Sequence, residues 1–223
     1  MAQLVMAMVV EGSTDARFLD VIAERTALQI LGKRSHTIVE VLPIQRLRPT
    51  GENLAQRILD AARSAYGYHL LLVHADADAS TRDAAWNKRI QPGFALIHSA
   101  LERNETVCNR YMAVIPVQMT EAWMLADSAA LLAVIGTNES LASLGLRHSP
   151  GQIESIADPK AHINGALETV RQSLPRSRRK YIHLSSLYEP LARRIDLGVF
   201  KISWSGRQSP RHFLKCRGLC NSF

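Results

Sequence analysis

The chain has 223 residues, of which 47% are hydrophobic and 21% are charged, with a formal net charge of +7. This composition is typical of a globular protein with a buried core and excludes a disordered chain. No apolar run reaches the roughly 18–20 residues that a membrane helix needs, the apolar start lacks the basic residues of a secretion signal, and three cysteines are too few for a disulfide framework. We therefore expect a cytosolic protein without a membrane partner.

Four short apolar segments predict the strands of a sheet. Their length and valine content favour strands that are buried on both faces, as in a parallel sheet. The four segments are Leu4–Val10, Thr37–Ile44, His69–His74 and Tyr111–Val117.

Amphipathic segments between these strands predict helices, each with a recognisable start. The first expected helix is capped by Ser13 or Thr14 and has Phe18 and Leu28 on its apolar face. A second helix covers residues 54–62, and a third begins at Pro92. A long fourth helix runs from a Thr120 cap through Leu132. Strands that alternate with helices predict an α/β fold with a central, mainly parallel sheet flanked by helices.

The pattern loosens beyond residue 136, where glycines and prolines interrupt it. We therefore expect an α/β core over residues 1–135 and a helix-rich basic region over residues 136–223 that packs on the core. Residues 171–223 hold twelve of the 27 Lys and Arg residues but two of the 20 acidic ones. This asymmetry predicts a cation-binding body and a surface that attracts polyanions, although a solvated basic helix without a ligand would have the same composition.

Three acidic residues follow predicted strands. Glu11 comes after the first strand, and Asp76 and Asp78 come after the third. The carboxyl ends of parallel strands form the ligand-binding edge of such a sheet, so we expect these carboxylates to converge, with Gly12 letting the chain turn sharply after Glu11. A divalent cation would relieve their mutual repulsion, and hard oxygen ligands suit Mg²⁺ or Mn²⁺. The alternative is that the two aspartates only cap a turn.

Several of these segments resemble one protein family. Val10-Glu11-Gly12-Ser13-Thr14-Asp15 is similar to the first motif of TOPRIM-like proteins, and Leu70–Asp78 resembles the metal-binding DxD strand of that family. The segment Thr120-Glu121-Ala122-Trp123-Met124-Leu125-Ala126-Asp127 resembles the Glu-Ala-Trp-Leu-Leu-Ala-Asp segment of the DUF4276 family, a TOPRIM-related bacterial branch. Asp158-Pro159-Lys160, Tyr181 and Ile195-Asp196-Leu197 are similar to its C-terminal half.

The resemblance implies a TOPRIM-like fold and a Mg²⁺-dependent nuclease that cleaves phosphodiester bonds of DNA or RNA. Glu11, Asp76 and Asp78 would be its acidic, metal-binding core. Relatives encoded beside ABC-type ATPases act in phage defence and abortive infection, which implies an antiviral role and an ATPase partner here.

Two further sets of residues are candidates for this site. Glu121 begins a helix after the fourth strand, so it can complete the acidic cluster as a catalytic residue, or it can complement the positive end of the helix. Lys160 is a candidate for stabilising negative charge on a phosphate. The densest basic run is a candidate nucleic-acid surface, with Tyr181 available for stacking, although a solvated helix end is the alternative. Its residues are Arg176, Arg178, Arg179 and Lys180.

A competing hypothesis is a non-catalytic regulatory or toxin-like subunit that binds an ABC-type ATPase and keeps the fold without the chemistry. The acidic residues would then serve turns and caps. No phosphate-binding P-loop is present, so any ATPase would be a separate partner.

Overall fold

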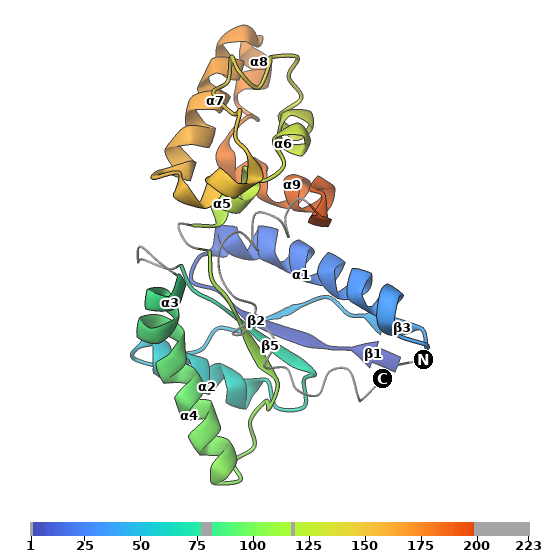
Figure 1. Ribbon diagram of the computed structural model, residues 1–223, viewed down its shortest axis with the longest axis vertical. Coiled ribbons are helices and arrows are strands. Elements are labelled where there is room, and N and C mark those ends of the chain that lie inside the picture. The colour runs from blue at the N-terminus through green and yellow to red at the C-terminus, as the bar shows by residue number, and fades with distance from the viewer. Residues whose placement is uncertain (1, 77–81, 117–118, 199–223) are drawn as a thin grey trace. The chain divides into compact units, whose positions relative to one another are not determined.

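The computed structural model describes residues 2–76, 82–116 and 119–198 (Figure 1). Among these, the described residues of 1–16 and 23–117 form one compact unit, and those of 17–22 and 118–208 form a second. Helix α1 (Ser13–Arg34) contributes residues to both. None of the helices in the described part of the chain has the length and apolar character that a membrane span requires.

The first unit is built on parallel strands. They are β1 (Ala2–Leu4), β2 (Met6–Val9), β3 (Val39–Val41), β4 (Gln45–Arg46), β5 (Leu70–His74) and β6 (Tyr111–Val114). Strands β1 and β3 form a two-stranded sheet, and the other four form a sheet of order β4-β2-β5-β6. Every pair is parallel, and β2 aligns Met6 with Leu70 and Val9 with Val73 of β5. The prediction of an α/β fold with a mainly parallel sheet is confirmed.

The first two predicted strands differ from the observed ones. The segment Leu4–Val10 is divided at Val5, where the chain leaves one sheet and enters the other. The backbone N–H of Val5 there donates to Nδ1 of His69 over 3.0 Å, and the Val5 carbonyl accepts from the His69 N–H over 2.9 Å. The segment Thr37–Ile44 contains only β3, and β4 begins after Pro43, which has no N–H to donate to a ladder.

Helices cover both faces of the four-stranded sheet. In Figure 1, α1 lies on one face, while α2 (Leu54–Ser64) and α4 (Gln91–Glu102) lie side by side on the other. Between β5 and α4 the chain forms α3 (Arg82–Ala85) and a π-helical turn, η1 (Trp86–Ile90), which the sequence pattern did not predict. Gly93 allows α4 to approach α2, because a Cβ there would lie 2.7 Å from side-chain atoms of Ile58.

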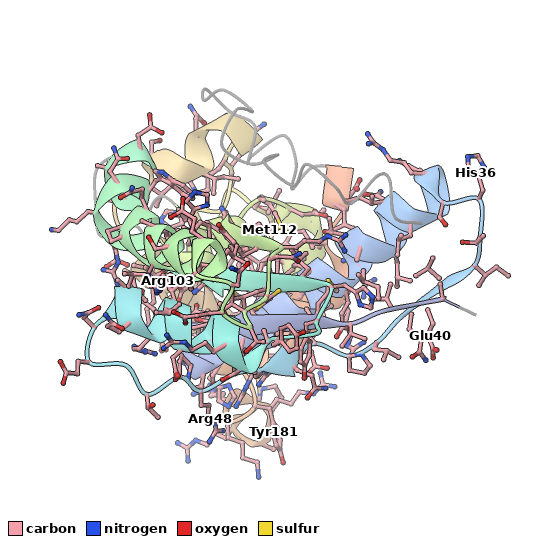
Figure 2. All side chains as sticks on the ribbon, turned by 90° about the horizontal axis from the view of Figure 1, so that it is seen from below. His36, Glu40, Arg48, Arg103, Met112 and Tyr181 are labelled. Carbon is pink, nitrogen blue, oxygen red and sulfur yellow. The ribbon has the colours of Figure 1, made fainter. Side chains whose placement is uncertain are left out.

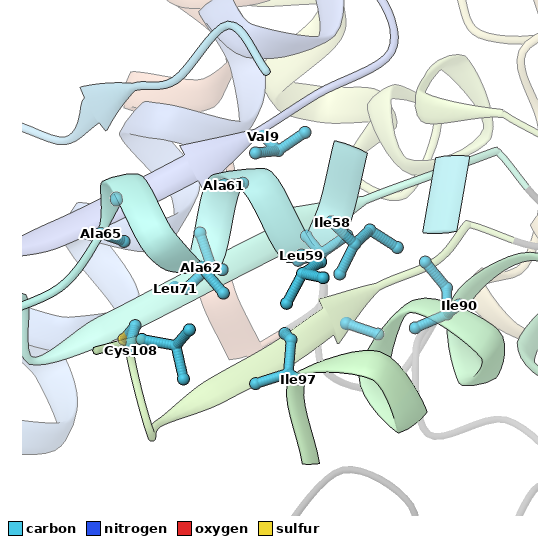
Figure 3. Close-up of a cluster of buried hydrophobic side chains, with 14 of the residues drawn as sticks. Val9, Ile58, Leu59, Ala61, Ala62, Ala65, Leu71, Ile90, Ile97 and Cys108 are labelled. Atoms are coloured by element: carbon cyan, nitrogen blue, oxygen red, sulfur yellow. The ribbon is translucent and has the colours of Figure 1, made fainter. Parts of the chain in front are cut away.

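Alternate strand residues form the core under α2 and α4. Ala7, Val9, Leu71 and Val73 point to this face and are almost fully buried, together with Ile58 (Figure 3). Burial of one large aliphatic side chain contributes about 1.5–3 kcal/mol to stability. The packed core therefore holds the carboxyl ends of β2 and β5 next to each other.

The described part of the second unit outside α1 is helical, and it includes α5 and α6, which precede the predicted boundary at residue 136. Its elements are α5 (Thr120–Met124), α6 (Ser128–Ile135), the 3₁₀ turn η2 (Pro150–Ser155), α7 (Pro159–Ser173), α8 (Arg176–Arg179), the 3₁₀ turn η3 (Leu184–Ser186) and α9 (Tyr188–Arg194).

Three helix starts differ from the predictions. The expected helix from Thr120 through Leu132 is two helices, because the chain breaks at Leu125–Asp127 and Asp127 caps α6 by accepting the Ala130 N–H over 2.9 Å. Met119, not Thr120, is the N-cap of α5. Gly12 is the N-cap of α1 and makes no side-chain bond, so the expected cap by Ser13 or Thr14 is wrong. Leu28, expected on the buried face of α1, is 53% exposed.

Candidate functional site

Glu11 and Asp76 lie together at the carboxyl edge of the four-stranded sheet. Glu11 follows β2 and Asp76 follows β5, and these strands are neighbours in the sheet. The backbone N–H of Asp76 donates a hydrogen bond to Oε2 of Glu11 over 3.0 Å. Both side chains reach solvent, with 28% and 32% of their surfaces exposed. The predicted convergence of Glu11 with Asp76 is therefore present in the structure.

The strand order explains why these two residues meet. In chain order the strands of the sheet are β2, β4, β5 and β6, but in space β4 lies on one side of β2 and β5 on the other. The connection after β2 therefore runs toward β4 and the connection after β5 runs toward β6, in opposite directions, which makes the β2–β5 boundary the topological switch point. Open parallel sheets bind ligands at that boundary, beyond the carboxyl ends of the strands.

The chain needs a glycine at position 12, after Glu11, for a different reason from the one predicted. Its φ of −109° is open to any residue, so no left-handed conformation is needed. A Cβ at this position would instead lie 2.3 Å from Oδ2 of Asp15. Glycine therefore makes room for a buried carboxylate in the first turn of α1.

Arg89 is a member of the site that sequence reasoning missed. Its guanidinium Nη2 donates to Oε1 of Glu11 and forms an ion pair, and 22% of the Arg89 side chain is exposed. Arg89 lies in η1, and π-helical turns occur frequently at functional sites. The one-residue bulge of such a turn leaves no periodic signal in a sequence, so only the fold identifies this arginine.

Arg89 also lines a groove of about 340 Å³ in the first unit. The groove is bordered by the start of α2 and by the π-helical turn, and its lining residues are Asn53, Leu54, Ala55, Lys88, Arg89 and Pro92. Two cationic side chains and no carboxylate line it. The groove therefore suits an anion adjacent to Glu11.

His74 ends β5 and lies beside the acidic pair. It is fully buried, and Nε2 lies 3.6 Å from Oδ1 of Asp76. Neither ring nitrogen has a hydrogen-bond partner among the described residues. Burial lowers the pKa of His74 to about 4, Glu11 opposes that shift, and Arg89 adds to it. The imidazole is consequently neutral at pH 7.

The residues present fit a hard divalent cation. Glu11 and Asp76 offer carboxylate oxygens, the ligands that Mg²⁺ and Mn²⁺ prefer, and a carboxylate has about four lone-pair sites, so the two bonds to Glu11 leave it free to bind a metal. Asp78, the third predicted ligand, lies outside the described residues. Within the part of the chain that the structure describes, no three His, Cys, Asp or Glu side chains form a complete metal cage. The described site is thus a pair of carboxylates with an adjoining arginine.

Glu121 belongs to the second unit. It is 6% exposed, and the Tyr188 hydroxyl donates to its Oε1 over 2.5 Å. Trp123 beside it is buried, as expected for a core residue. The sequence pattern did not predict the partner of Glu121, because Tyr188 lies 67 residues further along the chain.

Asp127, at the end of the same segment, accepts hydrogen bonds from two backbone N–H groups. Its Oδ1 caps α6, and its Oδ2 accepts the Asp196 N–H over 3.0 Å. Arg171 donates to the Ile182 carbonyl and pairs with Glu168. The bond from Asp196 to Asp127 thus links the end of α9 to the start of α6.

The basic run lies on and after the short helix α8. The side chains of Arg176, Arg178, Arg179 and Lys180 are all exposed. Tyr181 is 67% exposed, is labelled in Figure 2, and lies under the Lys180 ammonium at 4.9 Å from Nζ to the ring centroid. Arg178 and Tyr181 also border a hollow of about 300 Å³ with an apolar floor that includes Ile135 and Leu174. Lys160 is exposed in the first turn of α7.

Comparison with known proteins adds no further constraint, since no family model, curated protein or solved structure matches this chain. A function for this chain is therefore inferred from the geometry of the site and from the motifs of the sequence.

Proposed function

We propose that this protein is a nuclease of a TOPRIM-like type that cleaves phosphodiester bonds of DNA or RNA with the help of Mg²⁺ or Mn²⁺. The observation that carries the proposal is the meeting of Glu11 and Asp76 at the switch point of a parallel sheet. Two acidic side chains at the ligand-binding edge of such a sheet are costly unless a cation or a cationic group compensates them.

Glu11 and Asp76, together with the sequence-predicted Asp78, would hold the metal. A bound Mg²⁺ or Mn²⁺ would polarise the scissile phosphate and lower the pKa of a coordinated water. The amide of Asp76 fixes the Glu11 carboxylate in one orientation, so little reorganisation is needed on binding. The roles predicted for Glu121 and Lys160, completing the site and stabilising charge, stay predictions, because both residues belong to the second unit.

Arg89 and Lys88 would bind the phosphate groups of the substrate. They line the groove that adjoins Glu11, and a guanidinium donates two parallel N–H bonds to phosphate oxygens. Their positive charge would offset the repulsion between the acidic pair and a polyanion. In the structure, the Arg89 guanidinium forms an ion pair with Glu11 instead.

The basic run on and after α8 would bind the nucleic-acid backbone. Its four side chains are exposed, and Arg179 keeps N–H groups for phosphate beyond the Nε–H that it donates to the Leu174 carbonyl. An unpaired base could stack on the exposed Tyr181 ring in place of the Lys180 ammonium. An antiviral role and an ABC-type ATPase partner belong to the same proposal and rest on the resemblance to the DUF4276 family.

One observation favours the competing function, a non-catalytic subunit that binds an ATPase. Both oxygens of Glu11 already have partners, the Asp76 amide and Arg89, and this arrangement would also stabilise a strand-end turn without any metal. The two functions differ in whether Asp76 is needed for chemistry.

Cleavage assays with the full chain test the proposal. Labelled single- and double-stranded DNA and RNA are incubated with Mg²⁺ or Mn²⁺, with and without a candidate ABC-type ATPase partner. We expect metal-dependent cleavage that Asp76→Asn abolishes and that Glu102→Gln, an exposed carboxylate on α4, leaves unchanged. If no substrate is cut under any condition, or if Asp76→Asn cuts as well as the parent, the nuclease proposal is wrong.

A further inference from the structure

Two histidines meet in the second unit, far along the chain from Glu11 and Asp76. His148 lies before η2, and His162 lies in the first turn of α7. Their Nε2 atoms are 2.8 Å apart, and Nε2 of His162 lies 2.7 Å from the carbonyl oxygen of Gly145. Two imidazole nitrogens and a backbone oxygen thus converge on one point.

No placement of hydrogen atoms gives each of these three polar atoms a good hydrogen bond. A neutral imidazole has one N–H, and two Nε2–H groups cannot face each other at 2.8 Å. If His148 donates, the lone pair of His162 faces the Gly145 oxygen. If His162 donates, a single hydrogen must serve both acceptors, and each bond is weaker than one made alone.

A metal ion can bind the lone pairs of all three atoms, the two Nε2 nitrogens and the Gly145 oxygen, at once. Transition-metal ions such as Zn²⁺ bind imidazole nitrogen at about 2.0–2.1 Å, so two nitrogens on one ion are about 2.8–3.0 Å apart at an angle near 90° and about 3.3–3.4 Å apart at the tetrahedral angle. The observed separation of 2.8 Å matches the 90° angle of square-planar or octahedral sites, and a tetrahedral Zn²⁺ would separate the two nitrogens by about 0.5 Å more. Neutral imidazoles suit Zn²⁺, Cu²⁺ and Ni²⁺, whereas the carboxylates at the sheet edge suit Mg²⁺.

We propose that His148 and His162, with the Gly145 carbonyl, bind one divalent transition-metal ion such as Zn²⁺, with water completing its coordination. The site is independent of the proposed nuclease function. Both rings are only partly buried, so an ion can reach them. Its effect is structural: the ion links the segment that contains Gly145 and the buried Leu146 to the start of α7.

Calorimetry with Zn²⁺ tests this site in the full chain. The parent for the titration carries Cys216→Ser and Cys220→Ser, because cysteine thiolates are zinc ligands in general and these two lie outside the described residues. Saturating Mg²⁺ is present throughout to occupy the carboxylate site. We expect one equivalent of Zn²⁺ to bind with micromolar affinity and to raise the midpoint of thermal unfolding.

Single variants then assign the ligands. His148→Ala and His162→Ala should each weaken Zn²⁺ binding at least tenfold and remove the thermal shift, while His98→Ala, a histidine 70% exposed on α4, should change neither. His162→Gln keeps a polar side chain in α7 and guards against a loss of fold, which circular dichroism monitors. Absence of binding at millimolar Zn²⁺, or binding that survives in folded His148→Ala and His162→Gln, would overturn the proposal.

Discussion

The backbone amide of Asp76 donates to the carboxylate of Glu11 across the β2–β5 boundary, 65 residues apart in the chain. This bond holds the Glu11 carboxylate next to Asp76, the residue that carries the second carboxylate, at the edge where parallel sheets bind ligands. The bond also stabilises the negative charge of Glu11 at the end of β2. A cation, from the protein or from solution, compensates the same charge.

Asp76→Asn should weaken Mn²⁺ binding by about tenfold or more, because the variant replaces a charged oxygen ligand with a neutral amide. The free energy of unfolding should stay the same or rise slightly, since one of two neighbouring negative charges is removed. Isothermal titration of Mn²⁺ measures the affinity, and Glu102→Gln is the control for an unrelated carboxylate. Undiminished Mn²⁺ affinity in Asp76→Asn would show that this carboxylate is not a ligand.

Arg89→Met should have opposite effects on metal and on substrate. Mn²⁺ affinity should rise about three- to tenfold, because the guanidinium no longer competes for Oε1 of Glu11 and no longer repels the ion. Cleavage should fall about tenfold or more, since the phosphate loses a bidentate partner.

The matched control is Lys88→Met, a cation of the same π-helical turn that also lines the groove. It should reduce substrate binding without the gain in Mn²⁺ affinity. Equal Mn²⁺ affinity in the parent and in Arg89→Met would mean that Arg89 and the metal do not compete.

Sequence patterns predicted those parts of the fold that local periodicity controls. The run Leu70–His74 is apolar and short enough to be a buried strand, and β5 lies there. Pro92 lies in the first turn of α4, but helical backbone already begins at Arg82, so the helix was predicted and its start at Pro92 was wrong. The division at Val5 was not predictable, because the apolar run continues through it and the change of sheet depends on distant His69.

The site was predictable only where strand ends determine it. Glu11 and Asp76 follow apolar strands, and the rule for parallel sheets places them together. Arg89 was missed because its position depends on a π-helical turn, and Tyr188 was missed because its contact with Glu121 is long-range. Polar partners that approach from another element leave no spacing signal in the chain.

The buried imidazole of His74 should make stability depend on pH. Its pKa is about 4 in the folded protein and 6.5 in the unfolded chain, so the unfolded state binds more protons between these values. The stabilisation is fully present above pH 6.5 and is lost as the pH falls to 4. The loss amounts to about 3 kcal/mol at 1.36 kcal/mol per unit.

Urea unfolding from pH 7 to pH 4 in the presence of a chelator measures this effect. His74→Leu should show a pH-dependent loss smaller than that of the parent by about this amount, since the titrating group is absent. His98→Ala should follow the parent, because His98 is 70% exposed. Parallel curves for His74→Leu and the parent would contradict the assignment.

Replacing Arg178, Arg179 and Lys180 with Gln should weaken nucleic-acid binding and flatten its dependence on salt. Each lost phosphate contact should reduce the slope of log K against log salt by about 0.7–0.9. Fluorescence anisotropy between about 50 and 200 mM salt gives the slope. Arg193→Gln is the control, because this exposed arginine is already paired with Glu189. An unchanged slope in the triple variant would identify the run as a solvated helix end.

Tyr188→Phe should destabilise the second unit by about 1–3 kcal/mol, because it leaves a buried carboxylate oxygen of Glu121 without its hydroxyl donor. Tyr181→Phe, at a ring that is 67% exposed, should cost almost nothing. The free energy of unfolding is measured for Tyr188→Phe, for Glu121→Gln and for the double variant. The cost of the double variant should be smaller than the sum of the single costs, since either change removes the same bond. Additive costs would show that the 2.5 Å contact does not stabilise the fold.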